Sequence, residues 1–346
     1  MALPLSVASQ TGEDSEVTPE GQTVPAIPND VSSNGSFSYS VPFDLPEFRG
    51  LVPNVSLAYN SSDLSYARER NFTGIGWRLT GFPMIELMSP GGGTPFYSIG
   101  AQPTSIADRN IYILDGTPLL ACDDLAATNL WTLSYPDEYK TDSVSASCSS
   151  GGNFASQHED YRKILKTTNH WLIYAGDGTE YKYENLAALG ATTNPGVSTD
   201  YLTNGKWVLT AITDVNGNSV TIQYAVEGYD RGYATTPTAI TYAGYSVNFH
   251  YKSRPTMLSY ALGFDYMGGQ NNLLEAIEIL DGSSQMRAYD LSYELSSETA
   301  RNRLAGVTKY GSDYVFENTG NGWTGTITES PPYWTCHALV RPQNLI

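Results

Sequence analysis

The chain has 346 residues, enough for about two or three domains or for one large all-β domain. Its 36 acidic residues against 19 Lys and Arg give a net charge of −17, so nucleic acid and anionic membrane surfaces are not expected partners. Abundant Gly (32) and Tyr (25) with only 16% charged residues are typical of strands and turns and exclude a helical bundle.

The N-terminal lead, residues 1–34, is acidic and rich in Ser, Thr and Pro, and Phe37 is the first aromatic residue. Such a segment cannot bury enough apolar surface to offset its ordering entropy, so we expect a disordered lead with order beginning near Gly35. Residues 1–10 contain a short apolar stretch without basic residues, so no clear signal peptide is expected. We therefore expect synthesis in the cytoplasm and release to the outside by a non-classical route, with retention in the cytoplasm as the alternative.

Period-two alternation predicts a series of strands, each with one buried face. In the segment 54–60, Val55, Leu57 and Tyr59 lie on one face, and the segments 219–224, 246–251 and 289–293 show the same alternation. Further strands are expected at Ile111–Leu114, Tyr161–Lys166, Trp171–Tyr174, Trp207–Thr213, Leu273–Leu280, Leu304–Tyr310 and Tyr314–Glu317. No apolar run approaches the roughly 20 residues of a membrane span.

Dipeptides that accept positive φ separate these strands and predict antiparallel hairpins. They are Asp115-Gly116, Asp177-Gly178, Asn216-Gly217 and Asp281-Gly282. Gly217, Gly244 and Gly282 are each followed seven residues later by tyrosine, but at unequal intervals, which does not support a strict repeat. Helix is expected only as short turns at Leu64–Arg70 and Glu184–Leu189.

The predicted fold is all-β: an extended antiparallel sheet of successive hairpins over residues 35–318. The segments 91–108 and 137–160 are expected to be long surface loops, because they are rich in Gly, Pro, Ser and polar residues. Beyond Gly320 the alternation fades, so residues 319–346 are expected to form an irregular tail, as in a chain truncated before its natural continuation.

The sequence contains no pattern that predicts catalytic, cofactor-binding or metal-binding residues. The four histidines lack metal-ligand spacing, and His250 is expected to face solvent without partners. Asp214-x-Asn216-x-Asn218 resembles the start of a calcium loop, but the later glycine and glutamate are missing, which favours an Asx-stabilised turn. We therefore expect no enzymatic activity.

The three cysteines, Cys122, Cys148 and Cys336, are too few and too scattered to predict a disulfide scaffold or a zinc site. The odd count leaves at least one free thiol. The tyrosines would suit a sugar-binding platform, but their strand periodicity favours packing of a broad sheet.

One segment carries a resemblance to a known family. It runs from Gly35 through Ser56-Leu57-Ala58-Tyr59-Asn60-Ser61-Ser62 to Gly74-Ile75-Gly76-Trp77-Arg78-Leu79-Thr80-Gly81. This pattern resembles the SpvB-type N-terminal domain, named for the Salmonella virulence-plasmid B protein and found in B components of insecticidal toxin complexes, which are relatives of Rhs/YD-repeat proteins. Downstream features agree in order, namely Ile111–Gly116, Asp177–Tyr181, Trp207, Asp214–Asn218 and Tyr289–Tyr293, so the resemblance covers about residues 35–318.

Two features depart from the family pattern. The link between Tyr59 and Gly74 is longer and more charged than a compact Gly/Asn-rich connection, and Pro46-Glu47-Phe48 replaces the usual Pro-Pro-Gly. The family implies part of a β-shell that, with a C component, encloses a toxic polypeptide. The ADP-ribosyltransferase of the Salmonella protein is a separate C-terminal domain that needs a Glu-x-Glu pair, which this sequence lacks.

The resemblance implies a non-enzymatic structural or carrier module of a toxin or virulence protein. Its expected partners are other shell segments or a C-component-like toxin protein, with no cofactor. The alternative is a secreted carbohydrate-binding or adhesive β module. A shell segment alone would expose an apolar inner face and open edges, with Leu304–Tyr310 and Tyr314–Glu317 missing a neighbour. We therefore expect oligomers or marginal solubility from the isolated chain.

Overall fold

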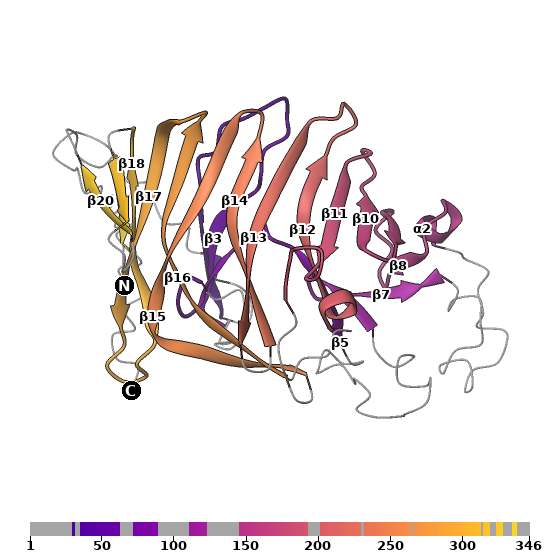
Figure 1. Cartoon of the computed structure of the whole chain (residues 1–346), viewed down its shortest axis with the longest axis horizontal. Coiled ribbons are helices and arrows are strands. Elements are labelled where there is room, and N and C mark those ends of the chain that lie inside the picture. Colours follow the sequence, from indigo (N-terminus) through magenta and orange to yellow (C-terminus); the bar gives the residue numbers. More distant parts are fainter. Residues whose placement is uncertain are drawn as a thin grey trace, which may run out of the picture.

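The computed structural model describes residues 30–31, 35–62, 72–88, 111–122, 145–192, 201–229, 232–263, 266–312, 314–318, 323–327 and 334–337. Almost all of this is antiparallel strand (Figure 1), which confirms the predicted all-β class. The first strands are β1 (Asp30–Val31), β2 (Phe37–Pro42), β3 (Ser56–Asn60), β4 (Trp77–Leu79), β5 (Met84–Met88), β6 (Ile111–Leu114), β7 (Thr117–Ala121), β8 (Phe154–Ser156), β9 (Lys163–Lys166), β10 (His170–Tyr174) and β11 (Glu180–Asn185).

The remaining strands carry most of the large sheet. They are β12 (Lys206–Thr213), β13 (Ser219–Tyr229), β14 (Gly232–Tyr242), β15 (Tyr245–Gly263), β16 (Tyr266–Asp281), β17 (Ser284–Leu295), β18 (Asn302–Tyr310), β19 (Tyr314–Asn318), β20 (Trp323–Ile327) and β21 (Trp334–His337). Two short helical segments, α2 (Ala146–Ser149) and the π-helix η3 (Tyr201–Gly205), interrupt the strands.

Strands β5 to β12 close into an antiparallel barrel, because each pairs with the next and β12 returns to pair with β5. This closure departs from the single open sheet that the sequence predicts. Its cause is a change of partner along one edge of β12, where residues 206–208 pair with β5 and residues 211–213 pair with β13. One strand therefore belongs to both the barrel and the open sheet.

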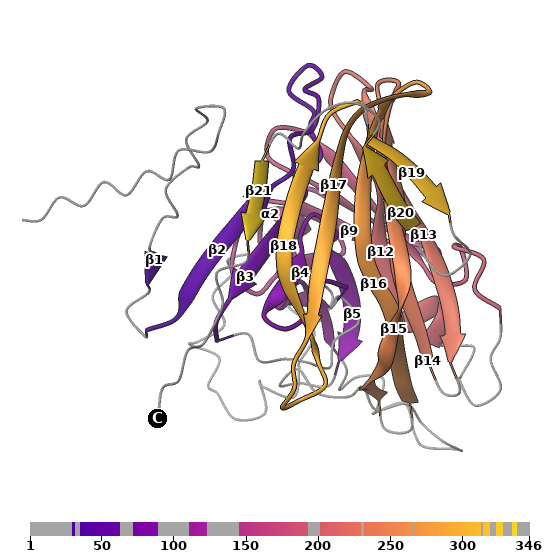
Figure 2. The ribbon, with the colours of Figure 1, turned by 90° about the vertical axis from the view of Figure 1, so that its left-hand side faces the viewer.

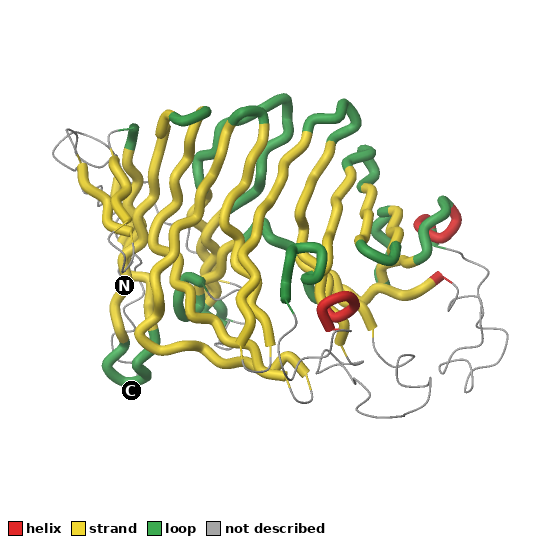
Figure 3. The backbone as a smooth tube through the Cα atoms, viewed as in Figure 1, coloured by secondary structure: helices red, strands yellow, loops and turns green. Residues whose placement is uncertain are grey.

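From β13 the sheet continues open through β18 to β21. Figure 3 shows hairpin turns gathered along the upper rim of this sheet. The four predicted turn dipeptides are confirmed: each connects two consecutive strands, and each carries a glycine at positive φ, between 59° and 94°. The turn between β14 and β15 escaped prediction because Ala243, with φ of 51°, precedes its glycine.

A small sheet, β1-β2-β3-β4, lies against one face of the open sheet (Figure 2), which we call the inner face. Its side chains and those of the inner face form one hydrophobic core. Trp77 is 6% exposed, which confirms its predicted burial. Gly74 and Gly76, with φ of 90° and 76°, form the bend that leads into β4.

Several local predictions are wrong. The predicted helical turn at Glu184–Leu189 is found only in part: residues 184–185 end β11, and a single turn follows in which the Leu189 N–H donates to the Asn185 carbonyl at 3.2 Å. The predicted surface loop 137–160 contains α2 and β8, and the predicted irregular tail 319–346 contains β20 and β21. Residues 64–70 and 91–108, and the lead up to residue 29, lie outside the described residues.

The two strands expected to miss a neighbour both have one. Leu304–Tyr310, within β18, pairs with β17 on one side and with β21 on the other. Tyr314–Glu317, within β19, pairs with β20. Within the described ranges, no helix is long and apolar enough to cross a membrane. The boundaries 35 and 318 of the predicted domain stay predictions.

Candidate functional site

The inner face of the open sheet is covered by the chain's own N-terminal segment. Asp44, in the loop after β2, contacts the sheet through several groups: its backbone N–H donates to the Tyr289 hydroxyl at 2.8 Å, and its carboxylate accepts from Lys309 Nζ at 2.8 Å. Arg287 donates to the Asp44 carbonyl at 2.9 Å. The hydrogen bond from Lys309 lowers the pKa of Asp44, so the carboxylate stays charged near neutral pH.

Further contacts extend this cover along the sheet. The Tyr242 hydroxyl donates to the Pro46 carbonyl at 2.9 Å, and the backbone N–H of Leu274 donates to the Phe72 carbonyl at 2.7 Å. Inner-face residues such as Val247 and Ile277 are fully buried. The prediction of an exposed apolar inner face is therefore wrong, because residues more than 190 positions away in sequence cover it.

Tyrosine side chains connect the strands of the open sheet in a recurring way. In three hairpins the backbone ladder starts at the turn and ends at an alanine, Ala211, Ala239 or Ala276. Beyond that alanine a tyrosine of the second strand donates its hydroxyl to a carbonyl of the first. These tyrosine bridges are Tyr224 to Leu209 at 2.9 Å, Tyr251 to Pro237 at 2.8 Å and Tyr293 to Leu274 at 2.5 Å.

Each bridging tyrosine also faces a β-bulge in the following strand. Tyr224 pairs with Pro237 across a register shift, and Tyr251 pairs with Leu274 in the same manner. Pro237 and Leu274 therefore each pair with one bridging tyrosine and accept a hydrogen bond from the next one. Burial raises the pKa of Tyr251 well above its usual value, which keeps the hydroxyl a donor across the physiological pH range.

Removing one bridge should destabilise the sheet measurably. Tyr251→Phe is expected to lower the free energy of unfolding by about 1–2 kcal/mol, because the Pro237 carbonyl loses its donor inside the protein. Urea unfolding followed by circular dichroism measures the change. Tyr161→Phe is the matched control, since Tyr161 is 76% exposed, and it should change stability by less than about 0.5 kcal/mol. Equal effects of the two variants would contradict a structural role for the bridge.

A slot of about 450 Å³ lies on the outer face, where β12 and β13 separate beyond Ala211. Its polar lining consists of the hydroxyls of Thr210, Thr221 and Thr238, the amide of Gln223, and the Lys182–Glu184 pair.

The polar groups of this slot carry little net charge, and Leu189, Ala211, Ile222 and Tyr224 complete its lining. Lys182 Nζ lies 2.6 Å from Glu184 Oε1, so the two charges neutralise each other. The remaining amide and hydroxyl groups can both donate and accept hydrogen bonds. The slot therefore suits a neutral ligand rich in hydroxyl groups better than an anion or a cation.

Two residues singled out in the sequence lie outside the slot. His250 is not solvent-facing: its side chain is 11% exposed, and its Nε2 lies 3.3 Å from Glu278 Oε2. The hydrogen bond to His250 lowers the pKa of Glu278. At the other position the Asx turn is confirmed, since Asp214 Oδ1 accepts from the backbone N–H of Asn216 at 2.8 Å and of Asn218 at 2.9 Å.

The barrel interior is filled by aromatic rings. Trp171 and Trp207 are both 0% exposed, with ring centroids 5.9 Å apart, and Tyr112 lies edge-on to both rings. The ammonium of Lys166 lies 5.5–5.9 Å from the centroids of these three rings, which places a cation against their faces. A barrel of this size has its interior filled by side chains, and here it is a packed core.

Lys206 is buried on the other side of β12, next to Trp207 in sequence. Desolvation lowers its pKa from 10.5 to about 7. Among the described residues, no group of three or more His, Cys, Asp or Glu side chains is placed to hold a metal ion.

The shifted pKa of Lys206 predicts a pH dependence of stability. Between pH 7 and 10.5 the unfolded state keeps the proton that the folded state has lost, so the free energy of unfolding should rise with pH. From pH 7 to pH 8.5 the expected gain is about 1.5 kcal/mol. Denaturant unfolding at a series of pH values measures it, and Lys206→Met should flatten the profile. An equal rise in that variant would assign the effect to other groups.

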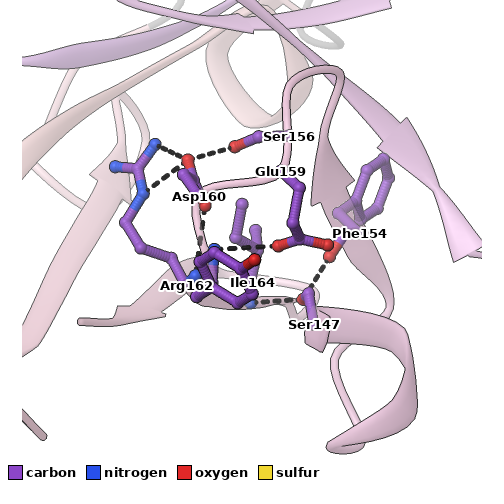
Figure 4. A network of polar contacts seen from close by, with 8 residues as sticks. Ser147, Phe154, Ser156, Glu159, Asp160, Arg162 and Ile164 are labelled. Carbon is purple, nitrogen blue, oxygen red and sulfur yellow. Dashed lines mark hydrogen bonds and ion pairs between the residues drawn. The ribbon is translucent and has the colours of Figure 1, made fainter. Parts of the chain in front are cut away.

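A network of polar contacts holds α2 against β8 and β9 (Figure 4). The Ser147 hydroxyl donates to the Phe154 carbonyl at 2.5 Å and accepts from the Ile164 N–H at 2.8 Å. Nearby, Asp160 accepts hydrogen bonds from Arg162 and Ser156; burial raises its pKa, but these bonds lower it overall. The negative charge of the Asp160 carboxylate is therefore balanced by the guanidinium of Arg162.

Cys122 and Cys148 form a disulfide bond between the end of β7 and α2. The spacing of the three cysteines does not predict this pairing, and the bond leaves Cys336 as the remaining cysteine. Three cysteines without a repeated spacing allow three pairings, and only the fold brings one pair within bonding distance.

The sequence matches no protein-family model and no curated protein. Solved structures do match. The N-terminal domain of the effector protein SpvB from Salmonella typhimurium strain LT2 aligns with a TM-score of 0.56 at 12% identity, over 79% of this chain and 98% of that domain. The resemblance read from the Gly35–Gly81 segment is thus confirmed at the level of the fold.

Two toxin complexes match over more of the chain. A chain of the Photorhabdus luminescens Tc holotoxin pore aligns with a TM-score of 0.54 at 15% identity, over 84% of this chain and 15% of that one. The TcdB2–TccC3 complex without its hypervariable C-terminal region gives 0.52 at 16% identity, over 87% of this chain and 16% of that one. This chain therefore corresponds to a small part of each toxin chain and shares its fold there.

Proposed function

We propose that the chain is a non-enzymatic structural module of a toxin or virulence protein, which contributes to a β-shell that encloses or delivers a toxic polypeptide. The observation that carries this proposal is the shared fold with toxin-complex chains over 84–87% of this chain. The continuous hydrophobic core supports it further, because a shell segment needs a rigid sheet.

The proposed partners are other shell segments or a C-component-like toxin protein. Edge strands present unpaired backbone groups that can pair with another strand, and among the described residues β21 is the last strand of the large sheet. The net charge of −17 argues against nucleic acid as a partner. We also propose that the protein acts outside the cell, since disulfide bonds such as Cys122–Cys148 persist mainly in oxidising surroundings.

Co-expression tests the shell role. The tagged chain is produced with each protein encoded beside its gene, and the purified material is treated with trypsin. We expect one neighbour to copurify at a fixed ratio and to be cleaved more slowly than the same neighbour produced alone. Absence of any stoichiometric partner, together with a stable monomer on size-exclusion chromatography, would contradict the shell role.

The slot between β12 and β13 favours carbohydrate binding as a second candidate function. Its hydroxyl and amide lining and its balanced charges suit a saccharide. On a glycan array, binding by the isolated chain that is lost in Gln223→Ala would support this function. Gln157→Ala is the matched control, because Gln157 is an exposed glutamine outside the slot. Absence of glycan binding by the unmodified chain would remove this candidate.

A further inference from the structure

The closed barrel has one weak junction. Strands β8 and β9 share a single matched pair, Phe154 with Ile164, whereas each of the other neighbouring pairs in the barrel shares at least three. With so few backbone hydrogen bonds of its own, this junction depends on contacts from outside the two strands.

Asn153, just before β8, supplies two of those contacts through its side chain, which donates to the Lys166 carbonyl at 2.7 Å and accepts from the Lys166 N–H at 2.6 Å. Helix α2 supplies others. The Ser147 hydroxyl lies between the strands and bonds to both, through the Phe154 carbonyl and the Ile164 N–H (Figure 4). The Gly152 N–H donates to the Ser147 carbonyl at 2.8 Å. Independently of α2, the Asn153 N–H donates to the Ile164 carbonyl of β9 at 3.0 Å. A Cβ on Gly152 would lie 2.3 Å from Ser147 Oγ, so the chain is closely packed here.

Helix α2 cannot hold this position through its own stability. It has four residues, far fewer than an isolated helix needs, although Ser145 caps it and Glu159 accepts from the Ala146 N–H at 2.9 Å. The covalent tether is the disulfide from Cys148 to Cys122, whose own N–H donates to the Asn153 carbonyl at 3.0 Å. The disulfide therefore fixes α2 to the end of β7 and, through Ser147, closes the junction between β8 and β9.

We propose that the Cys122–Cys148 disulfide is a redox-sensitive latch on the β8–β9 junction of the barrel. The bond closes in oxidising surroundings, and reduction releases α2 and loosens the junction. Both cysteines are partly exposed, which gives a reductant access. This proposal goes beyond the shell role and does not depend on it.

The chemistry of release is thiol–disulfide exchange. A thiolate of a dithiol reductant attacks one sulfur, the S–S bond breaks, and a mixed disulfide forms with one cysteine while the other leaves as a thiolate and takes up a proton. The second thiol of the reductant then displaces the remaining cysteine, which is also protonated. The protein gains two electrons and two protons, and the reductant is oxidised to a disulfide.

Amide hydrogen exchange of the full chain, with and without dithiothreitol, tests the latch. In the reduced protein, amides of residues 147–166 should exchange about a hundredfold faster, as expected for loss of a typical disulfide constraint. Amides of β15 to β17 serve as the internal reference and should not change. Equal exchange of residues 147–166 in both states would overturn the proposal.

Variants separate the latch from general destabilisation. Cys148→Ser should show the fast exchange without reductant and no further response to it, whereas Cys336→Ser should respond as the unmodified chain does. Ser147→Ala should loosen the same residues while the disulfide stays intact. Thiol titration of the oxidised chain after unfolding in denaturant should give one reactive thiol at most, and titration after reduction should give three. Three thiols without reductant would also overturn the proposal.

Discussion

Trp207→Ala is expected to lower the free energy of unfolding by about 3–5 kcal/mol, among the largest effects of a single substitution in this chain. Trp207 is 0% exposed, and its ring contacts Trp171 and Tyr112 at centroid distances of 5.9 and 5.4 Å. Removal of the indole leaves a cavity in the barrel interior that rigid strands cannot fill. Urea unfolding monitored by far-UV circular dichroism measures the loss.

Two further variants test whether the loss of stability comes from the barrel interior. Trp207→Phe keeps an aromatic ring in the cluster and should cost less than the alanine variant. Leu295→Ala, at a side chain that is 53% exposed, should change stability by less than about 0.5 kcal/mol. If Trp207→Ala costs no more than Leu295→Ala, the barrel interior is not a stabilising core.

Gly81→Ala should be almost as harmful, with a loss of about 3 kcal/mol or more. Gly81 has φ of 94°, and an added Cβ would lie 2.5 Å from the Asn54 carbonyl oxygen. Because that oxygen belongs to the backbone before β3, it cannot move aside without disturbing the small sheet. The cost therefore combines left-handed backbone strain with a steric clash.

Gly116→Ala separates these two contributions. Gly116 has the same φ of 94°, but nothing lies within 4 Å of an added Cβ. In this control only backbone strain is added, so its free energy of unfolding should fall by about 1–2 kcal/mol. The difference between the two variants, measured by denaturant unfolding, gives the cost of the clash. Equal losses would show that the approach of Asn54 to Gly81 is not tight in solution.

The strands and their turns could be predicted from the sequence because their signals are local. Alternation defined the buried faces of β3, β13 and β15, and dipeptides such as Asn216-Gly217 marked the turns between consecutive strands. The turn at Ala243-Gly244 was missed, since alanine at positive φ has no sequence signature.

Closure of the barrel and cover of the inner face could not be predicted, because both depend on contacts between distant segments. Nothing in residues 206–213 shows that one edge of β12 divides between β5 and β13. Likewise, the contacts of Asp44 with Lys309 and of Tyr242 with Pro46 join residues 265 and 196 positions apart. Pairing of Cys122 with Cys148 depends on the fold in the same way.

The candidate slot was missed for a related reason. Its residues are ordinary threonines and a glutamine, and the feature that creates it is the separation of two strands. A sequence signal for this separation does exist. Strands β12, β14 and β16 each contain the pattern Leu or Pro, any residue, Ala, Ile, at residues 209–212, 237–240 and 274–277. In each strand this pattern coincides with the β-bulge and with the alanine at which the hairpin's backbone pairing ends. The spacing of Gly217 and Gly244 to Tyr224 and Tyr251 was part of that pattern.

The tyrosine bridges have a consequence for how such a sheet can change in size. Each hairpin brings its own turn, its own bulge and the tyrosine that reaches the preceding strand, so its junction with the next hairpin is always of the same kind. Duplication of one hairpin in the gene would therefore add a strand pair whose junctions with its neighbours are already provided, and only the cover of its inner face would need new contacts. A gene can thus lengthen or shorten the sheet by whole hairpins, while the closed barrel at its other end stays the same.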